Sequence, residues 1–229
     1  MLKIRRLAAF SDGNYGGNPA GVVIDSALPD SVRLQQIAAE VGYSETVFAT
    51  PRKQHGWRVR YFSPQSEVPF CGHATIALGA ALACDHGDGV FDLALNQASI
   101  TVEGWRQSSA DAVSLSAALQ SPPTSSSALE PALAESILAL FGLSRVSLQP
   151  SLPMAFAQAG ARHVIVGLNS RETLRNMAYD QAAGKMLMDD AGLITVMLVY
   201  SETARLFHAR NPFASVSYTR LTLPTICSV

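Results

Sequence analysis

Residues 70–84 read FCGHATIALGAALAC, a run of small and apolar side chains that is interrupted near its start by His73. A helix of this composition has no polar face, so we expect it to be buried on all sides, with Cys84 in the core. Gly87 follows at a place where glycine commonly ends a helix. Strand-like segments precede and follow the run, which predicts a sheet wrapped around a central helix.

The rest of the chain contains further strand-like and helix-like segments. Residues 31–41 carry apolar side chains at helical spacing, with Asp30 or Ser31 as the N-cap. Residues 11–19 are rich in Gly and Asn and predict a loop. Further strands are predicted at residues 2–10, 20–24, 46–50, 57–62, 90–95, 99–102, 112–115, 162–167, 193–200 and 204–209, and further helices at 128–141 and 171–191.

The composition also divides the chain into two parts. Residues 121–127 read SPPTSSS and predict a linker between an N-terminal part, residues 1–120, and a C-terminal part, residues 128–214. The segment VRYFSP near residue 60 is weakly similar to ARLFHARNP near residue 207, which suggests two similar halves.

Charge and cysteine content exclude several classes of protein. The formal net charge is −1 and no basic block is present, which argues against nucleic-acid binding. No apolar stretch reaches the ~18 residues of a membrane-spanning helix. The three cysteines, Cys71, Cys84 and Cys227, lack the regular spacing of a disulfide framework, so we expect a cytoplasmic protein. The histidines show no metal-ligand spacing, and no metal site is predicted.

Glu45 is the first candidate for chemistry. It stands in Ser44-Glu45-Thr46, between a predicted helix and a predicted strand, and is followed by Val47 and Phe48. A carboxylate at the start of a strand beside apolar residues is half-desolvated, a setting suited to general acid/base catalysis. The alternative is a capping or solvent-facing glutamate.

The start of the apolar helix is the second candidate. Gly72 allows a ligand to approach the backbone, and the unpaired N–H groups of a helix start can bind a substrate carboxylate. His73 is either a ligand contact or a residue that satisfies a neighbouring backbone group. Cys71 is a possible base or nucleophile, or else a small buried residue. Asn18, in the turn before Pro19, is a further candidate substrate contact.

Together these segments resemble the phenazine-biosynthesis-like isomerases. AAFSDGNYGGNPAGVVI at residues 8–24 resembles the opening strand, loop and Gly-Asn-Pro turn of that family. AAEVGYSETVF at 38–48 resembles its helix and Ser-Glu-Thr motif, and VRYFSPQSEVPFCGHATIALGAAL at 59–82 resembles its Cys-Gly-His-Ala-Thr signature. The order and spacing match from about residue 4 to 84, and more loosely from about 90 to 214.

This resemblance implies the α+β fold of diaminopimelate epimerase and proline racemase. In that fold two similar halves each wrap a curved, mostly antiparallel sheet around a central helix, and the active site lies in the cleft between them. The family moves a proton between carbons of a small carboxylated substrate. Its catalytic glutamate falls on Glu45, and its substrate-contacting Gly-His falls on Gly72 and His73. No metal or organic cofactor is implied, and homodimers are usual.

The sequence departs from the family after residue 214. The expected Asp-Pro-x-Thr-Gly-Ser motif, which opens the second central helix, does not occur in the sequence. We therefore expect a truncated C-terminal half and a non-native tail at residues 215–229.

Two alternative functions stay open. One is a Cys71-dependent amino-acid racemase or epimerase of the same fold, and the other is an inactive remnant or a ligand-binding protein.

Overall fold

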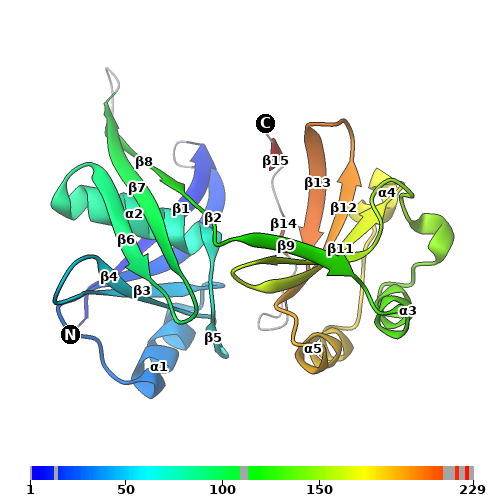
Figure 1. Cartoon of the computed structure of the whole chain (residues 1–229), viewed down its shortest axis with the longest axis horizontal. Coiled ribbons are helices and arrows are strands. Elements are labelled where there is room, and N and C mark those ends of the chain that lie inside the picture. Colours follow the sequence, from blue (N-terminus) through cyan, green and yellow to red (C-terminus); the bar gives the residue numbers. More distant parts are fainter. Residues whose placement is uncertain (1, 13–14, 109–112, 214–219, 222–224, 227–229) are drawn as a thin grey trace. The chain divides into compact units, whose positions relative to one another are not determined.

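The computed structural model describes residues 2–12, 15–108, 113–213, 220–221 and 225–226 of the chain. The chain divides into two compact units, Met1–Pro123 and Thr124–Val229. Each unit contains one sheet with its own helices (Figure 1). No helix in the described part of the chain is long and apolar enough to cross a membrane.

The first unit is built on an eight-stranded, mostly antiparallel sheet. The strand order is β1-β2-β3-β4-β6-β7-β8, with β5 paired to β4. The β2/β3 and β4/β6 pairs are parallel. The elements of this unit are β1 (Ile4–Asp12), β2 (Tyr15–Ile24), α1 (Ser31–Val41), β3 (Thr46–Pro51), β4 (Trp57–Phe62), β5 (Glu67–Val68), α2 (Gly72–His86), β6 (Gly89–Ala94), β7 (Ser99–Ser108) and β8 (Val113–Leu119).

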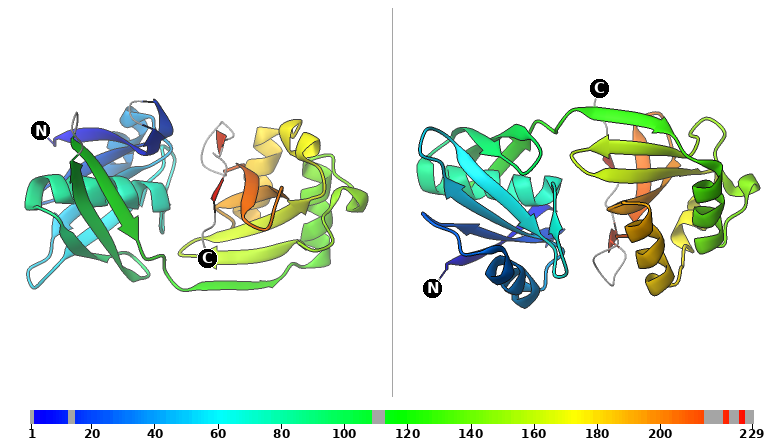
Figure 2. Two further views of the ribbon diagram at one scale, coloured as in Figure 1. Left: turned by 90° about the horizontal axis from the view of Figure 1, so that it is seen from above. Right: turned by 60° about the horizontal axis from the view of Figure 1, so that its bottom comes forward.

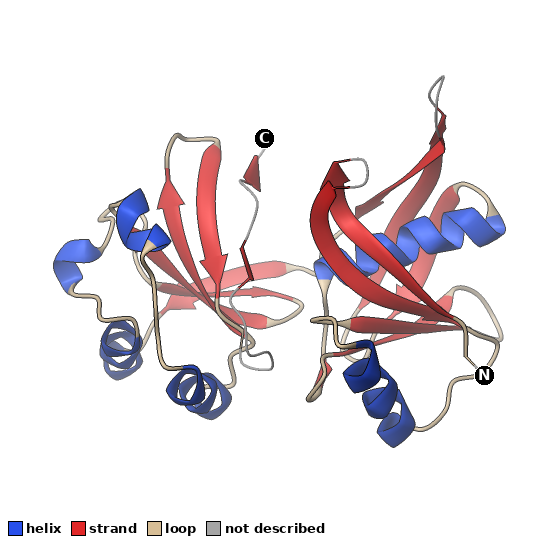
Figure 3. Cartoon of the chain, turned by 180° about the vertical axis from the view of Figure 1, so that it is seen from behind, coloured by secondary structure: helices blue, strands red, loops and turns tan. Residues whose placement is uncertain are grey.

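Helix α2 lies inside the curve of this sheet and packs against β1, β2, β3, β6, β7 and β8 (Figure 3). Most of its side chains from His73 to Ala83 are buried. The helix touches β7 through two glycines, since a Cβ added at Gly104 would lie 2.3 Å from the carbonyl oxygen of Gly79. The predicted arrangement of a sheet around a central apolar helix is therefore confirmed for this unit.

The end of α2 differs from the prediction. Cys84 is exposed rather than in the core, because the last turn of the helix is open to solvent while strands cover the earlier turns. Asp85 in this turn pairs with Arg5 at 2.6 Å. Gly87 then ends the helix with a φ of 87°, and its N–H donates to the carbonyl of Ala83.

Helix α1 covers the other face of the sheet. It spans the predicted residues, and the Asp30 side chain caps it by accepting from the N–H of Arg33 at 2.9 Å. Its apolar side packs on residues of β2, β3 and β4. The buried members of this cluster are Val23, Leu34, Ile37, Ala38, Phe48 and Phe62.

The predicted loop at residues 11–19 is wrong over most of its length. Residues 13–14 lie outside the described part of the chain, but Tyr15–Ile24 form β2, which pairs with β1. Gly16 and Gly17 adopt φ values of 66° and 79°, so these glycines supply backbone conformations that other residues rarely adopt. A Gly-rich composition therefore concealed a strand.

The second unit has helices packed against its own sheet (Figures 1 and 2). The strand order is β14-β13-β12-β11-β10-β9, with β15 paired to β13. Ile137, Leu174 and Met188 of the three α-helices pack against β11 and β12. The elements are β9 (Thr124–Ala128), α3 (Pro131–Leu140), a 3₁₀ turn (Arg145–Ser147), β10 (Ala155–Ala159), β11 (Arg162–Leu168), α4 (Arg171–Arg175), α5 (Gln181–Asp190), β12 (Thr195–Ser201), β13 (Leu206–Asn211), β14 (Arg220–Leu221) and β15 (Thr225–Ile226).

The first and last strands of this unit lie in two segments that were predicted to be a linker and a non-native tail. Most of the predicted linker at residues 121–127 belongs to β9, an exposed edge strand that is polar because it has little to bury. The tail at 215–229 lies largely outside the described residues, as does Cys227. Its described residues, Arg220–Leu221 and Thr225–Ile226, pair with β13.

Candidate active site

Glu45 is placed at the start of β3 by the pairing of β3 with β2. Its carbonyl oxygen accepts from the N–H of Gly21 at 3.1 Å. Phe48 packs against α1, and alternate residues of a strand share a face, so Thr46 points toward α1 and Val47 points to the opposite face. Glu45 shares that opposite face, which is the side of α2. Its side chain is buried, with 5% of its surface exposed, so it is not solvent-facing.

His73, in the first turn of α2, meets Glu45 there. Its Nε2 atom lies 3.4 Å from Oε2 of Glu45, and its side chain is as deeply buried. The separation suits an ion pair and is longer than the 2.7–3.2 Å of a good hydrogen bond. The residue that opens the apolar helix with a polar side chain thus faces the carboxylate rather than solvent.

Cys71 lies on the other side of the same imidazole. It is the N-cap residue of α2, in an extended conformation, and its side chain does not cap the helix. Its Sγ atom lies 3.1 Å from Nδ1 of His73. The imidazole therefore contacts the thiol through Nδ1 and the carboxylate through Nε2, and Sγ and a carboxylate oxygen of Glu45 lie within 4.8 Å of each other. The three side chains form one compact cluster.

Two further residues, Thr75 and Tyr61, support this cluster, and neither was predicted from the sequence. The hydroxyl of Thr75 donates to the carbonyl of Cys71 at 2.7 Å, and the N–H of Thr75 donates to the same oxygen at 3.0 Å. The Tyr61 hydroxyl lies 2.7 Å from the Thr75 hydroxyl and, with the Thr75 proton already given, donates to it. Burial raises the pKa of Tyr61 well above its ordinary value, so the phenol stays protonated. Thr75 follows Cys71 by four residues, or about one helical turn, and this spacing is the only sequence feature that could have indicated the contact.

Gly72 leaves open space at the start of α2. A Cβ added there would have a single neighbour within 4 Å in the described part of the chain, the Leu119 side chain at 4.0 Å. Packing therefore does not require glycine at this position, in contrast to Gly79, where an added Cβ would lie 2.5 Å from Val102. The open backbone of Gly72 adjoins the first-turn N–H groups, which point out of the helix.

Asn18 lies on the same face of the sheet as Glu45. Val23 of β2 packs against α1, so Val22 and, four residues earlier, Asn18 point toward the α2 side. The structure thus brings Glu45, Cys71 and His73 into contact and puts Asn18 on their side of the sheet.

The three contacting side chains also have the donor types of a metal site. Their ligand atoms lie within 4.8 Å of one another. The two nitrogens of His73, however, point to different partners, so one ion bound by all three residues would have to displace one of these contacts.

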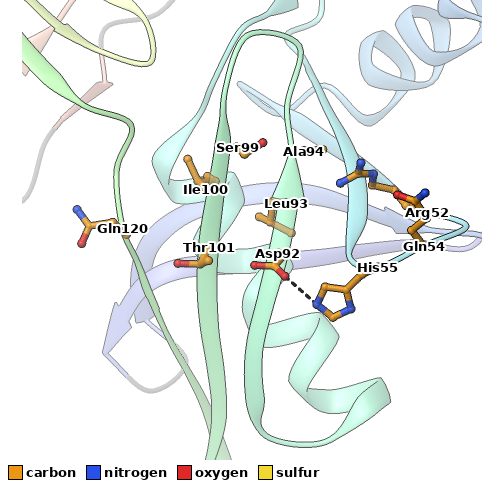
Figure 4. A pocket seen from close by; sticks show the side chains of 10 residues that line it. All are labelled: Arg52, Gln54, His55, Asp92, Leu93, Ala94, Ser99, Ile100, Thr101 and Gln120. Carbon is orange, nitrogen blue, oxygen red and sulfur yellow. Dashed lines mark ion pairs between the residues drawn. The ribbon is translucent and has the colours of Figure 1, made fainter.

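A groove of about 480 Å³ lies elsewhere on the first unit (Figure 4). Residues of the β3–β4 turn and of β6 and β7 line it, and His55 contacts Asp92 there at 2.7 Å. Both side chains are more than half exposed, at 81% and 51%. Glu45, Cys71 and His73 are not among the residues that line this groove.

Solved structures show the class of fold. The Bacillus anthracis phenazine biosynthesis protein of the PhzF family is 20% identical, with a TM-score of 0.71 over 91% of this chain and 70% of that one. A hydroxyproline epimerase from Agrobacterium vitis is 10% identical, with a TM-score of 0.59 over 98% of this chain and 71% of that one. The fold is therefore the one shared by PhzF proteins and proline-type epimerases, and the predicted α+β class is confirmed.

The family follows from the sequence match. The family model described as phenazine biosynthesis-like protein matches residues 7–217, and the chain belongs to this family. An uncharacterized isomerase of Deinococcus radiodurans is 46% identical over 83 residues, which are 36% of this chain and 27% of that protein. An uncharacterized isomerase of Escherichia coli is 41% identical over 75 residues, which are 33% of this chain and 25% of that protein. The chain thus matches little more than a quarter of the length of these curated relatives.

Proposed function

We propose that this chain is an isomerase that moves a proton between carbon atoms of a small carboxylated metabolite, with Glu45 as the general acid/base. The observation that carries the proposal is the burial of Glu45 against His73 at the N-terminal end of α2. The names of the curated relatives, uncharacterized isomerases, support the reaction class.

The start of α2 is the proposed site for the substrate carboxylate. First-turn N–H groups and the positive end of the helix dipole favour an anion there. The open space at Gly72 lets a ligand reach this backbone, and Asn18 offers an amide from the same side of the sheet. Binding the carboxylate at Gly72 and His73 would hold the neighbouring C–H bond toward Glu45.

The proposed chemistry uses one carboxylate twice. Glu45 removes a proton from one carbon of an unsaturated substrate, and the C–H electron pair forms a new C=C bond while the existing C=C bond opens toward a second carbon. The helix start stabilises the negative charge that develops on the conjugated carboxylate. Glu45 then returns the proton to a second carbon, so atoms and charge balance. The acid/base step needs only protein groups.

A racemase that uses Cys71 as the base is the second candidate. The 3.1 Å contact between its thiol and His73 is the observation that favours it. The two candidates differ in which residue is indispensable. Replacing Glu45 by Gln abolishes turnover in the first case, and replacing Cys71 by Ala does so in the second.

Deuterium incorporation tests both candidates without a known substrate. The chain is incubated in D₂O with single compounds from a panel of amino acids and unsaturated cyclic carboxylic acids, and C–H loss is followed by proton NMR. We expect exchange with at least one compound, and a loss of about 10²–10⁴-fold in Glu45→Gln. Glu40→Gln, an exposed glutamate on α1, is the matched control and should match wild type.

Other outcomes of this assay count against the proposal. Undiminished exchange in Glu45→Gln would remove Glu45 from the mechanism. If no compound exchanges but carboxylates shift the amide signals of Gly72 and His73, the chain is a ligand-binding protein and the isomerase proposal is wrong.

A further inference from the structure

The proposed proton transfer uses Glu45 and leaves the buried thiol of Cys71 without a role. Yet Cys71 lies 3.1 Å from Nδ1 of His73, while Nε2 of the same ring lies 3.4 Å from Glu45. All three residues are less than a tenth exposed. The two contacts of the imidazole therefore connect the thiol to the carboxylate, and Sγ itself lies within 4.8 Å of a carboxylate oxygen of Glu45.

The two contacts constrain where the ring proton resides. A neutral imidazole carries one proton, on Nδ1 or on Nε2. With the proton on Nδ1, the lone pair of Nε2 would face the oxygens of the Glu45 carboxylate, which is repulsive. With the proton on Nε2, the ring donates toward Oε2 of Glu45, and Nδ1 is left as an acceptor for the Cys71 S–H group. The second arrangement gives both the Cys71 thiol and the Glu45 carboxylate a favourable contact with the ring.

The backbone of Cys71 is held so that its thiol stays in place. Its carbonyl oxygen accepts from both the N–H and the hydroxyl of Thr75, at 3.0 and 2.7 Å. The buried Tyr61 hydroxyl backs the Thr75 hydroxyl at 2.7 Å. The N–H bond is the first hydrogen bond of any helix, and the hydroxyls of Thr75 and Tyr61 add two further contacts behind Cys71.

We propose that Cys71 is a positioning residue of this site: its thiol donates to Nδ1 of His73 and keeps the ring proton on Nε2, facing Glu45. The proposal rests on the proposed function for its catalytic consequence. The Nε2–H group holds Oε2 of Glu45, so the carboxylate is oriented with Oε1 as the oxygen that exchanges the proton. The 3.4 Å contact would shorten once substrate is bound, as catalytic hydrogen bonds commonly do.

The tautomer of His73 can be measured directly in the 229-residue chain. The chain has five histidines, so ¹⁵N-labelled imidazole signals can be assigned with a His73→Asn variant. We expect neutral His73 protonated on Nε2 in wild type and in Cys71→Ser, whose hydroxyl also donates. We expect a mixture of tautomers in Cys71→Ala. Cys84→Ala, the same change at the exposed end of α2, should leave the signals unchanged.

Three NMR results would overturn the proposal. They are a ring protonated on Nδ1 in wild type, a ring protonated on both nitrogens at neutral pH, whose Nδ1 cannot accept from the thiol, and a Cys71→Ala spectrum with the wild-type tautomer. None of these readouts depends on turnover. The positioning role and the isomerase activity can therefore fail separately.

Kinetics of deuterium exchange then separate positioning from the other roles of a cysteine. For a positioning residue, Cys71→Ala lowers kcat about tenfold with KM nearly unchanged, and Cys71→Ser recovers most of the rate. If Cys71 were the catalytic base, the enzyme would lose its activity in both Cys71→Ala and Cys71→Ser. A purely structural thiol would change Tm but neither kcat nor the tautomer.

Discussion

Nε2 of His73 lies 3.4 Å from Oε2 of Glu45, and each of the two side chains has only 5% of its surface exposed. The contact joins the start of a strand to the start of a helix, across a separation of many residues in the chain. It explains why a polar residue opens an otherwise apolar helix, and why a glutamate is tolerated beside the apolar core. The proposed site is therefore built where the sheet and its enclosed helix meet.

Substitutions at two glycines of α2 should separate ligand binding from packing. Gly72→Ala meets no close neighbour, so we expect little change in unfolding free energy but roughly tenfold weaker binding of simple carboxylates. Gly79→Ala puts a Cβ 2.5 Å from Val102 and should destabilise the fold by about 1–3 kcal/mol. Urea unfolding and NMR titration with benzoate measure the two effects. Unchanged benzoate affinity in Gly72→Ala would place the carboxylate elsewhere.

Paired threonine-to-valine changes test the two faces of the sheet. Thr46 is fully buried toward α1, and its hydroxyl has no hydrogen-bond partner among the described residues. We therefore expect Thr46→Val to leave stability unchanged or raise it by about 1 kcal/mol. Thr75→Val removes a hydroxyl bonded to Cys71 and Tyr61, and should cost about 1–3 kcal/mol. Equal effects of the two changes in urea unfolding would contradict this difference.

Much of the first unit could be predicted because its signals are local. The spacing of apolar residues gave α1 its bounds, and the uniformly small, apolar run gave α2. The failures share a cause, since β2 begins in a Gly-rich segment and β9 is an exposed edge strand. Both strands are formed because they pair with a neighbouring strand. Composition indicates which residues are buried and does not show such pairing. Cys84 was misplaced because a pattern does not show where the covering strands end.

The candidate site was predictable as residues but not as contacts. Glu45, Gly72 and His73 were identified from the motifs and their family resemblance. The contacts of His73 with Cys71 and Glu45 depend on where β3 starts relative to α2, which no local sequence pattern encodes. Tyr61 lies on a different element, β4, and contacts the hydroxyl of Thr75 from there. Sequence alone therefore leaves out the residues that hold the site in place.

Ionisation of Tyr61 should make the first unit sensitive to alkali. Burial raises the pKa of Tyr61 above its ordinary value of 10.0, so the unfolded chain loses this proton before the folded chain does. Stability is thus fully present below pH 10 and falls as pH rises above it. In Tyr61→Phe this part of the pH dependence should disappear, whereas Tyr15→Phe, at an exposed site, should keep it. Urea midpoints from pH 8 to 11 measure it, and identical slopes in all three proteins would rule it out.

His163 should give the second unit the opposite response, at acidic pH. Its Nδ1 lies 2.7 Å from the Thr195 hydroxyl, and burial lowers the pKa of His163 below its ordinary value of 6.5. The unfolded chain therefore takes up this proton first as pH falls. Stability is fully present above pH 6.5 and decreases as pH drops toward the lower pKa of the folded state.

The slope below pH 6.5 should shrink in His163→Gln, while His55→Gln, at an exposed position, should retain the wild-type slope. Urea unfolding between pH 4.5 and 8, followed on NMR signals of the second unit, measures this response. Proton NMR titration of the imidazole gives the pKa of His163 independently. An imidazole that titrates at or above 6.5 would show that burial does not disfavour its charged form, and the predicted acid sensitivity would then have another origin.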